Sequence, residues 1–220
     1  MTAPEARRTR SFRSGLIGTR KVPRAVREPQ MLQMAGRLFA EHGFHAASMD
    51  EIADAAGISK PMLYNYFGSK EGLYFAFLEL AYRDVISSID AAVQETVAAG
   101  GGSAEQLRNG LRAYYRFVGE HSDAFRVLFR ELGDPGGRLT QPRRRLQRRV
   151  AAAIHDILAE EGSSPDQPAD TDALAEAYLG AARGLADWWL DQSDWTADDV
   201  ADRLWKLIMG GLRDLGSPRD

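Results

Sequence analysis

The chain has 220 residues, of which 44% are hydrophobic and 27% are charged, a balance typical of a folded globular protein. It contains no cysteine, which excludes disulfide bonds and thiolate chemistry and is compatible with a reducing compartment. No uncharged apolar run is long enough to cross a bilayer, so the sequence predicts a cytoplasmic protein without a membrane partner.

The net charge of -3 conceals an asymmetry along the chain. Residues 1–27 carry eight basic residues against one glutamate, whereas the rest of the chain carries 20 basic and 30 acidic residues. We interpret residues 1–27 as a basic, disordered arm on an acidic body, which suits a protein that meets a polyanion at one end. Such an arm is either simply solvated, or it becomes ordered on phosphates or in a minor groove.

Residues 28–75 predict a small domain of three helices, the first of which braces the other two. This helix is expected to open at Pro29, where a missing amide hydrogen costs little, and to run to about His42. Gly43 is expected to end it, because glycine readily takes the left-handed conformation found at helix ends.

A helix-turn-helix is predicted directly after this brace. Ser48 and Glu51 have the spacing of a capping box, which satisfies free amides at a helix start, and Gly57 supplies the turn that ends this short helix. Ser59 is expected to cap a second short helix with a polar and aromatic outer face. In a helix-turn-helix, the second helix enters the DNA major groove.

Residues 76–220 predict further helices. Ser69 is expected to cap a long helix from Lys70 to about Ala98, and Ser103 with Gln106 has the spacing of another capping box. Later helices are expected over residues 103–118, 122–132, 142–160, 170–192 and from Thr196 onward, where Thr196 and Asp199 form a cap. With no strand pattern, the predicted fold is all-α: a three-helix DNA-binding domain, then a helical bundle, with about nine helices in total.

The run over residues 56–73, with its turn glycine, capping serine, aromatic pair and following Ser-Lys, resembles the DNA-binding domain of the TetR (tetracycline repressor) family. The resemblance covers about residues 27–75 and does not extend over residues 80–220, where that family varies with its ligand. It implies a homodimer that binds a palindromic operator in double-stranded DNA and that responds to a small apolar or amphipathic effector.

The candidate DNA-contacting residues are Ser48, Lys60, Pro61, Met62, Tyr64, Asn65, Tyr66 and Lys70. Ser48 and Lys70 begin helices and can bind phosphates. Lys60 can donate to guanine or to a phosphate, and Asn65 can read adenine through two hydrogen bonds. The proline and methionine suit thymine methyls, and the tyrosines suit backbone oxygens. The matching family positions contact DNA, although Met62 stands where a small residue or threonine is common. Taken singly, each of these residues is better interpreted as an ordinary half-buried aromatic or a solvated charge, but the ordered set with two caps and a turn glycine favours DNA binding.

An effector cavity is implied by the resemblance, and the surplus of aromatic residues over 107–190 favours a place for it between helices. Most of these aromatics are expected to pack in the core. The candidate lining residues are Phe117, Phe125, Phe129 and Trp188. Six arginines follow: Arg138, Arg143, Arg144, Arg145, Arg148 and Arg149. They form either a solvated face or a site for an anionic effector head group, such as the phosphates of an acyl-CoA.

A stripe of apolar and small residues near the C-terminus suggests a dimer seam. The candidate interface residues are Leu179, Ala182, Ala186, Leu204, Ile208 and Leu212. They could form a four-helix seam between two copies or pack within one chain, and their spacing alone does not separate these possibilities. A two-fold dimer would hold the two DNA-reading helices about 34–36 Å apart, one turn of DNA.

No catalytic, metal-binding or cofactor-binding pattern is recognisable. The four histidines are scattered, and His42 and His45 straddle the expected helix end at Gly43. We therefore predict a sequence-specific DNA-binding transcriptional regulator, a repressor that a small-molecule effector releases from its operator. The alternatives are an activator, an architectural DNA-binding protein without effector switching, and an α-helical enzyme or transport module.

Overall fold

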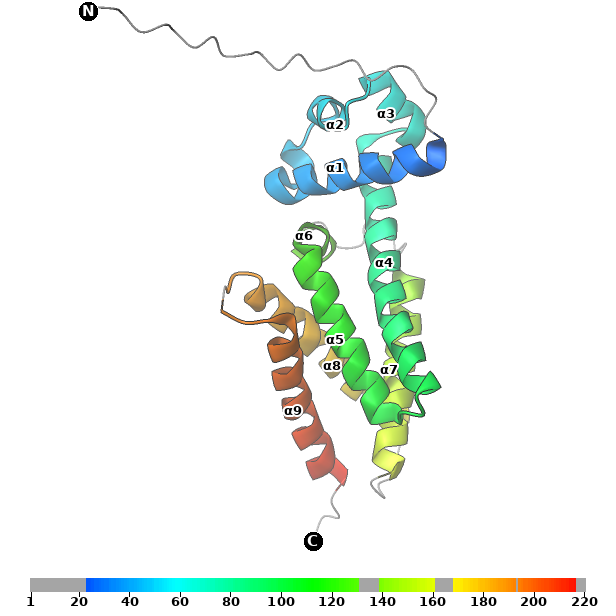
Figure 1. Ribbon diagram of the computed structural model, residues 1–220, viewed down its shortest axis with the longest axis vertical. Helices are drawn as coiled ribbons and strands as arrows, with labels where there is room; N and C mark the ends of the chain where they lie inside the picture. Colours follow the sequence, from blue (N-terminus) through cyan, green and yellow to red (C-terminus); the bar gives the residue numbers. More distant parts are fainter. Residues whose placement is uncertain (1–22, 131–138, 161–167, 193, 217–220) are drawn as a thin grey trace, which may run out of the picture.

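The computed structural model describes residues 23–130, 139–160, 168–192 and 194–216, which form α-helices and no β-strand (Figure 1). The helices of this described part are α1 (Arg24–Ala46), α2 (Met49–Ala55), α3 (Lys60–Phe67), α4 (Lys70–Ala98), α5 (Ser103–Glu120), α6 (Ser122–Arg130), α7 (Thr140–Glu160), α8 (Pro168–Trp189) and α9 (Ala197–Gly216). The predicted all-α fold is confirmed. None of these helices is both long and apolar enough to cross a membrane.

Helices α1, α2 and α3 and the first turns of α4 form a unit at one end of the molecule, here called the head (Figure 1). Its core consists of apolar side chains at helical spacing, including Phe39, Ile52, Leu63 and Leu73, each fully buried. The rings of Phe39 and Tyr74 pack edge to face with their centroids 5.2 Å apart. Because α1, α2, α3 and α4 all contribute to this core, it fixes how α2 and α3 are set against each other.

Helix α1 is longer than predicted at both ends. It begins at Arg24, with Pro29 inside it, and it continues to Ala46 through a kink at Gly43, where φ is 75° and ψ is 163°. A proline in the second turn removes one helical hydrogen bond but has a suitable φ, so the helix passes through it. Residues 24–27, which we had assigned to the basic arm, therefore belong to α1; residues 1–22 lie outside the described part.

Some predicted helix caps are confirmed and others are wrong. Ser48 and Glu51 form the reciprocal capping box, the Ser69 side chain accepts from the Gly72 amide at 3.0 Å, and Thr196 with Asp199 caps α9. The predicted Ser59 cap is absent, since its side chain makes no capping hydrogen bond. The box predicted at Ser103 is also wrong: Ser103 lies inside α5, and the Gln106 side chain donates to the Gly101 carbonyl at 3.0 Å instead.

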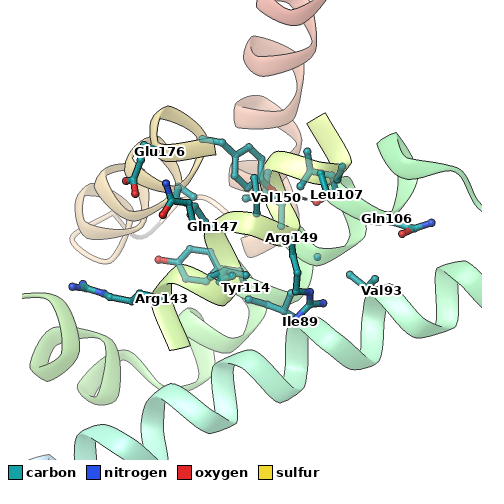
Figure 2. A pocket seen from close by; sticks show the side chains of 18 of the residues that line it. Ile89, Val93, Gln106, Leu107, Tyr114, Arg143, Gln147, Arg149, Val150 and Glu176 are labelled. Carbon is teal, nitrogen blue, oxygen red and sulfur yellow. Dashed lines mark hydrogen bonds between the residues drawn. The ribbon is translucent and has the colours of Figure 1, made fainter. Parts of the chain in front are cut away.

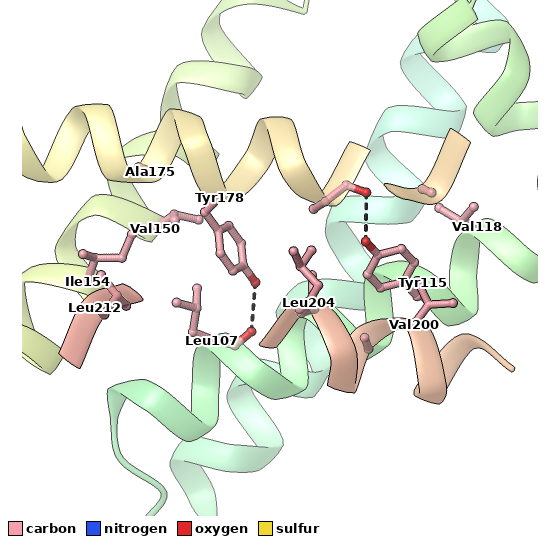
Figure 3. Packing of buried hydrophobic residues seen from close by; sticks show 14 of the residues in the cluster. Leu107, Tyr115, Val118, Val150, Ile154, Ala175, Tyr178, Val200, Leu204 and Leu212 are labelled. Atoms are coloured by element: carbon pink, nitrogen blue, oxygen red, sulfur yellow. Dashed lines mark hydrogen bonds between the residues drawn. The ribbon is translucent and has the colours of Figure 1, made fainter. Parts of the chain in front are cut away.

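Helices α5, α7, α8 and α9 pack into a second core, here called the bundle (Figure 3). Two tyrosines cross it and end on backbone carbonyls: the Tyr115 hydroxyl donates to Ala182 at 3.0 Å, and the Tyr178 hydroxyl donates to Leu107 at 3.2 Å (Figure 3). Burial raises the pKa of both hydroxyls, so they act as neutral donors. The helices are therefore tied together by satisfied polar groups as well as by apolar contacts.

Head and bundle meet along α4 and α6. Residues of α4 from Leu73 to Tyr82 belong to the core of the head, whereas Ile89 and Val93 of the same helix approach Gly110 of α5. Val127 of α6 is fully buried in the head's core, and its carbonyl accepts a hydrogen bond from the Tyr74 hydroxyl at 3.5 Å. A change in the bundle can therefore reach the head through two packed helices.

Candidate nucleic-acid interface and effector cavity

Helix α3 shows one apolar and one exposed face, as the spacing of its residues predicts. Leu63 is fully buried, whereas Lys60, Pro61 and Asn65 are exposed and Tyr64 is 41% exposed. The exposed face of α3 can thus present an amide, a hydroxyl and an ammonium group to the edges of bases.

Lys60 pairs with a residue of another helix, which its position in the sequence does not reveal. Its Nζ lies 2.7 Å from Oδ2 of Asp50, at the start of α2, and this hydrogen bond raises the pKa of Lys60. Both side chains are largely exposed, so the ion pair is weak and a DNA phosphate can replace the carboxylate. The pair also masks a negative charge on the surface that would meet DNA.

Ser48 and Lys70 also form hydrogen bonds within the head. The Glu51 carboxylate accepts from the Ser48 amide at 3.1 Å and from its hydroxyl at 2.9 Å, so the capping box occupies the hydroxyl that we expected to meet a phosphate. The first amides of α2 remain as donors. Lys70 donates to the His45 carbonyl at 2.9 Å and lies 4.8 Å from the Phe44 ring centroid. Its ammonium group has further donors for a phosphate.

Two arginines of the first turn of α1 lie beside α3 and are further candidates for DNA contact that we did not predict. The Arg24 guanidinium lies 5.0 Å from the Tyr66 ring centroid, and Nη1 of Arg27 donates to Sδ of Met62 at 3.4 Å. Met62 and Tyr66 are consequently half-buried and less open to DNA than Tyr64. The signal was available: Arg24, Arg27 and Glu28 have helical spacing, and Arg24 pairs with Glu28 at 2.8 Å.

A cavity of about 720 Å³ lies between α4, α5, α7 and α8 (Figure 2). Its volume is within the range of small-molecule sites. The apolar part of its wall includes Ile89, Val93, Leu107, Leu111, Leu146 and Val150. The polar part includes Tyr82, Tyr114, Gln147, Arg143, Arg144, Arg149, Arg183, Asp156 and Glu176. The wall is thus mixed, with more arginines than carboxylates.

Three of the four residues that we expected to line an effector site, Phe117, Phe125 and Trp188, do not line this cavity. Phe117 is buried and stacks on His121 at 4.4 Å between ring centroids, and Phe125 is buried in the bundle core. Trp188 is 44% exposed and packs edge-on against Trp195. Phe129 falls in the last turn of α6, and its side chain is outside the described part. The aromatic residues of the cavity wall are tyrosines instead.

The arginine cluster divides between cavity and solvent. Arg143, Arg144 and Arg149 line the cavity, and Arg149 forms an ion pair with Asp90 of α4. Arg145 and Arg148 are exposed and do not line it, and Arg138 lies outside the described residues. The arginines that line the cavity are, like Arg145 and Arg148, exposed to solvent.

Most of the expected dimer-seam residues are covered by their own chain. Ala182, Ala186, Leu204 and Leu212 are buried in the bundle core, Leu179 lines the cavity and Ile208 is half-buried. These four buried side chains are not available to a partner. The outer faces of α8 and α9 are open instead: Leu207 is 73% exposed, and a Cβ added at Gly180 or Gly184 would meet nothing within 4 Å.

No group of three metal-ligating side chains comes together in the part of the chain that the structure describes.

A helix-turn-helix with an exposed second helix, joined by a shared helix to a bundle with a cavity, is the architecture of a DNA-binding transcriptional regulator of the ligand-responsive kind. Comparison with known proteins agrees. Residues 32–77 match the family described as bacterial regulatory proteins, tetR family, and residues 103–211 match the tetracyclin repressor-like C-terminal domain. The chain belongs to the TetR family of transcriptional regulators.

Relatives include both activators and repressors. The transcriptional activator FasR of Mycolicibacterium smegmatis is 33% identical over 198 residues, covering 87% of this chain and 85% of that protein. The transcriptional repressor KstR2 of the same organism is 26% identical, covering 86% and 91%. A TetR-like regulator from Rhodococcus sp. RHA1 superposes with a TM-score of 0.73 at 34% identity, covering 87% of this chain and 98% of that chain.

Proposed function

We propose that this protein is a homodimeric repressor that binds a palindromic operator through α3 and is released by a small-molecule effector in the cavity. The single observation that carries the proposal is the position of Tyr82. This residue of α4 belongs to the buried core of the head and also lines the cavity. A ligand that alters the packing around Tyr82 therefore acts on the helix that carries the head.

The switching step is a shift between two populations. Without effector, α4 holds the heads at a spacing that fits successive major grooves. With effector, the wall formed by α4 and α7 moves, and the Tyr74–Val127 contact carries part of the change through α6. The effector must bind the released state more tightly than the DNA-bound state, because equal affinity for both would shift nothing.

Operator binding with and without effector tests this proposal. An operator is selected from random DNA, and the affinity of the full-length protein for it is measured by fluorescence anisotropy at fixed salt, against random DNA as competitor. The proposal expects strong sequence discrimination and weaker binding once effector is bound. An architectural protein would show little discrimination, and an affinity that no bound ligand changes would contradict the switch.

An activator is the second candidate, because the relative FasR is a transcriptional activator. In vitro transcription from a promoter that contains the operator separates the two. A repressor lowers transcript yield until effector is added, whereas an activator raises it. Either outcome is compatible with DNA binding through α3.

The dimer itself makes a prediction at Leu207. Leu207→Glu is expected to yield a monomer in size-exclusion chromatography with light scattering, because it places a charge on the outer face of α9. Thermal stability of the protomer should change little, since Leu207 is 73% exposed. Val97→Glu, at a 48% exposed apolar residue of α4, is the matched control and should remain dimeric. A dimer unaffected by Leu207→Glu would move the interface to another face.

A further inference from the structure

The Tyr82 hydroxyl is the unusual polar group of the cavity wall. Tyr82 is 7% exposed, and its hydroxyl has no hydrogen-bond partner among the described residues. The buried hydroxyls of Tyr74, Tyr115 and Tyr178 each donate to a backbone carbonyl instead. A buried hydroxyl without a partner is costly, so its presence on a cavity wall marks a place where a bound molecule completes the hydrogen bond.

Unpaired positive charge lies on the same wall. Within the described part of the chain, Arg143, Arg144 and Arg183 line the cavity without a carboxylate partner. Some other arginines of the described part are paired, since Arg112 lies 2.8 Å from Asp202 and Arg116 lies 2.8 Å from Asp198, whereas Arg145 and Arg148, outside the cavity, have no carboxylate partner among the described residues either. What distinguishes Arg143, Arg144 and Arg183 is their place on the cavity wall, where these solvent-exposed guanidinium groups can bind an external anion.

The tyrosines and arginines are close enough to act together. Burial raises the pKa of Tyr82, and the positive charge of Arg143 opposes this shift. Burial likewise raises the pKa of Tyr114, and Arg183 opposes it. Figure 2 shows Arg143 and Tyr114 toward one end of the cavity, and Gln106 and Val93 toward the other. Tyr82 of α4 thus lies near Arg143 of α7, and Tyr114 of α5 lies near Arg183 of α8.

The rest of the cavity wall indicates which chemical groups the bound anion can carry. Leu107, Leu111, Leu146 and Val150 offer an apolar surface that suits a hydrocarbon chain. The carboxylates on the wall are Asp156, which accepts from the Ser103 hydroxyl at 3.3 Å, and Glu176. Figure 2 shows Glu176 on the same side of the cavity as Arg143 and Tyr114, so its carboxylate disfavours more than one anionic group there. A molecule with one anionic head and an apolar body matches this distribution.

We infer that the effector is an amphipathic anion whose carboxylate or phosphate head is bound by the Tyr82 hydroxyl and the Arg143 guanidinium, with Arg144 and Arg183 nearby. The apolar body lies along Leu111, Leu146 and Val150. This inference rests on the proposed function for its biological role, but the binding step stands on the cavity alone.

Calorimetric titration of the full-length protein with decanoate, decyl phosphate and decanol tests the inference without DNA. The two anions are expected to bind about tenfold or more tightly than decanol, and their order distinguishes a carboxylate from a phosphate site. Arg143→Gln should abolish that advantage and leave decanol unchanged. Arg145→Gln is the matched control, because Arg145 lies on the same helix but does not line the cavity. This variant should bind all three probes like the parent. Decanol binding as tightly as the anions would overturn the inference.

Tyr82→Phe supplies an independent readout. It should weaken binding of both anions several-fold and raise the melting temperature of the free protein, because it removes a buried hydroxyl that lacks a partner. A lower melting temperature with unchanged anion affinity would show that the hydroxyl has a structural role only. Anions that bind as expected without releasing the operator would contradict the switch but not this inference. Operator release by decanol alone would contradict the inference but not the switch.

Discussion

Asn65→Ala is expected to weaken binding of each head to the operator by about tenfold or more, since a bidentate contact of asparagine with adenine contributes about 1–3 kcal/mol. The loss should be specific to the selected operator, with binding to random DNA nearly unchanged. Because Asn65 is exposed, the melting temperature and the dimer mass should stay the same. Fluorescence anisotropy with operator and random duplexes at one salt concentration measures the effect.

Gln94→Ala is the matched control for Asn65→Ala. Gln94 is another exposed amide side chain, on the part of α4 far from the head, so its removal should leave operator affinity unchanged. Operator binding by Asn65→Ala that equals the binding of both Gln94→Ala and the parent would show that α3 does not read bases. Equal losses for operator and random DNA would instead assign Asn65 to the phosphate backbone.

Gly72→Ala is expected to disable the head through backbone packing. A Cβ at Gly72 would lie 2.0 Å from the backbone carbonyl oxygen of Phe67, the last residue of α3. No side chain can rotate to relieve this contact, so α3 must shift against α4. We expect a loss of about 1–3 kcal/mol in the free energy of unfolding and a loss of operator binding. Denaturant titration and anisotropy measure the two effects.

Gly102→Ala is the control for a glycine substitution as such. Gly102 precedes α5 with a φ of -72°, which alanine also adopts, and an added Cβ would meet nothing within 4 Å. Stability and DNA affinity should therefore change little. The cavity should still bind its ligand in Gly72→Ala, since the bundle core is distant from Phe67. Normal operator binding by Gly72→Ala would show that the contact between α3 and α4 is looser than described.

The local features of the head could be predicted from the sequence. The capping box at Ser48, the turn at Gly57, where φ is 65°, and the burial of Leu63 all depend on residues within a few positions of one another. The partners of the surface charges could not. Asp50 reaches Lys60 only because the turn folds α2 back beside α3, and Arg27 reaches Met62 across 35 positions.

The residues that line the cavity, and those left open for a dimer partner, could not be predicted because they depend on long-range packing. On α5, Tyr114 lines the cavity, whereas the adjacent Tyr115 donates to the Ala182 carbonyl of α8. Because both are tyrosines, the sequence does not reveal which of them faces the cavity and which packs in the core. The same holds for Ala182 and Leu204: their spacing marks an apolar stripe, and only the assembled bundle shows that its own helices cover it. Side-chain spacing predicts a face, whereas the neighbours of that face are set by the whole fold.

The burial of Val127 and Leu139 within the core of the head has a consequence for the order of folding. Both residues follow α4 and α5 in the chain, yet they pack with residues of α1 and α4. During synthesis, the DNA-binding end cannot complete its apolar core until residue 139 has left the ribosome. An isolated N-terminal fragment would lack these two side chains and would expose the surface that they cover, so reading of DNA by this chain is tied to the presence of the segment that follows α5.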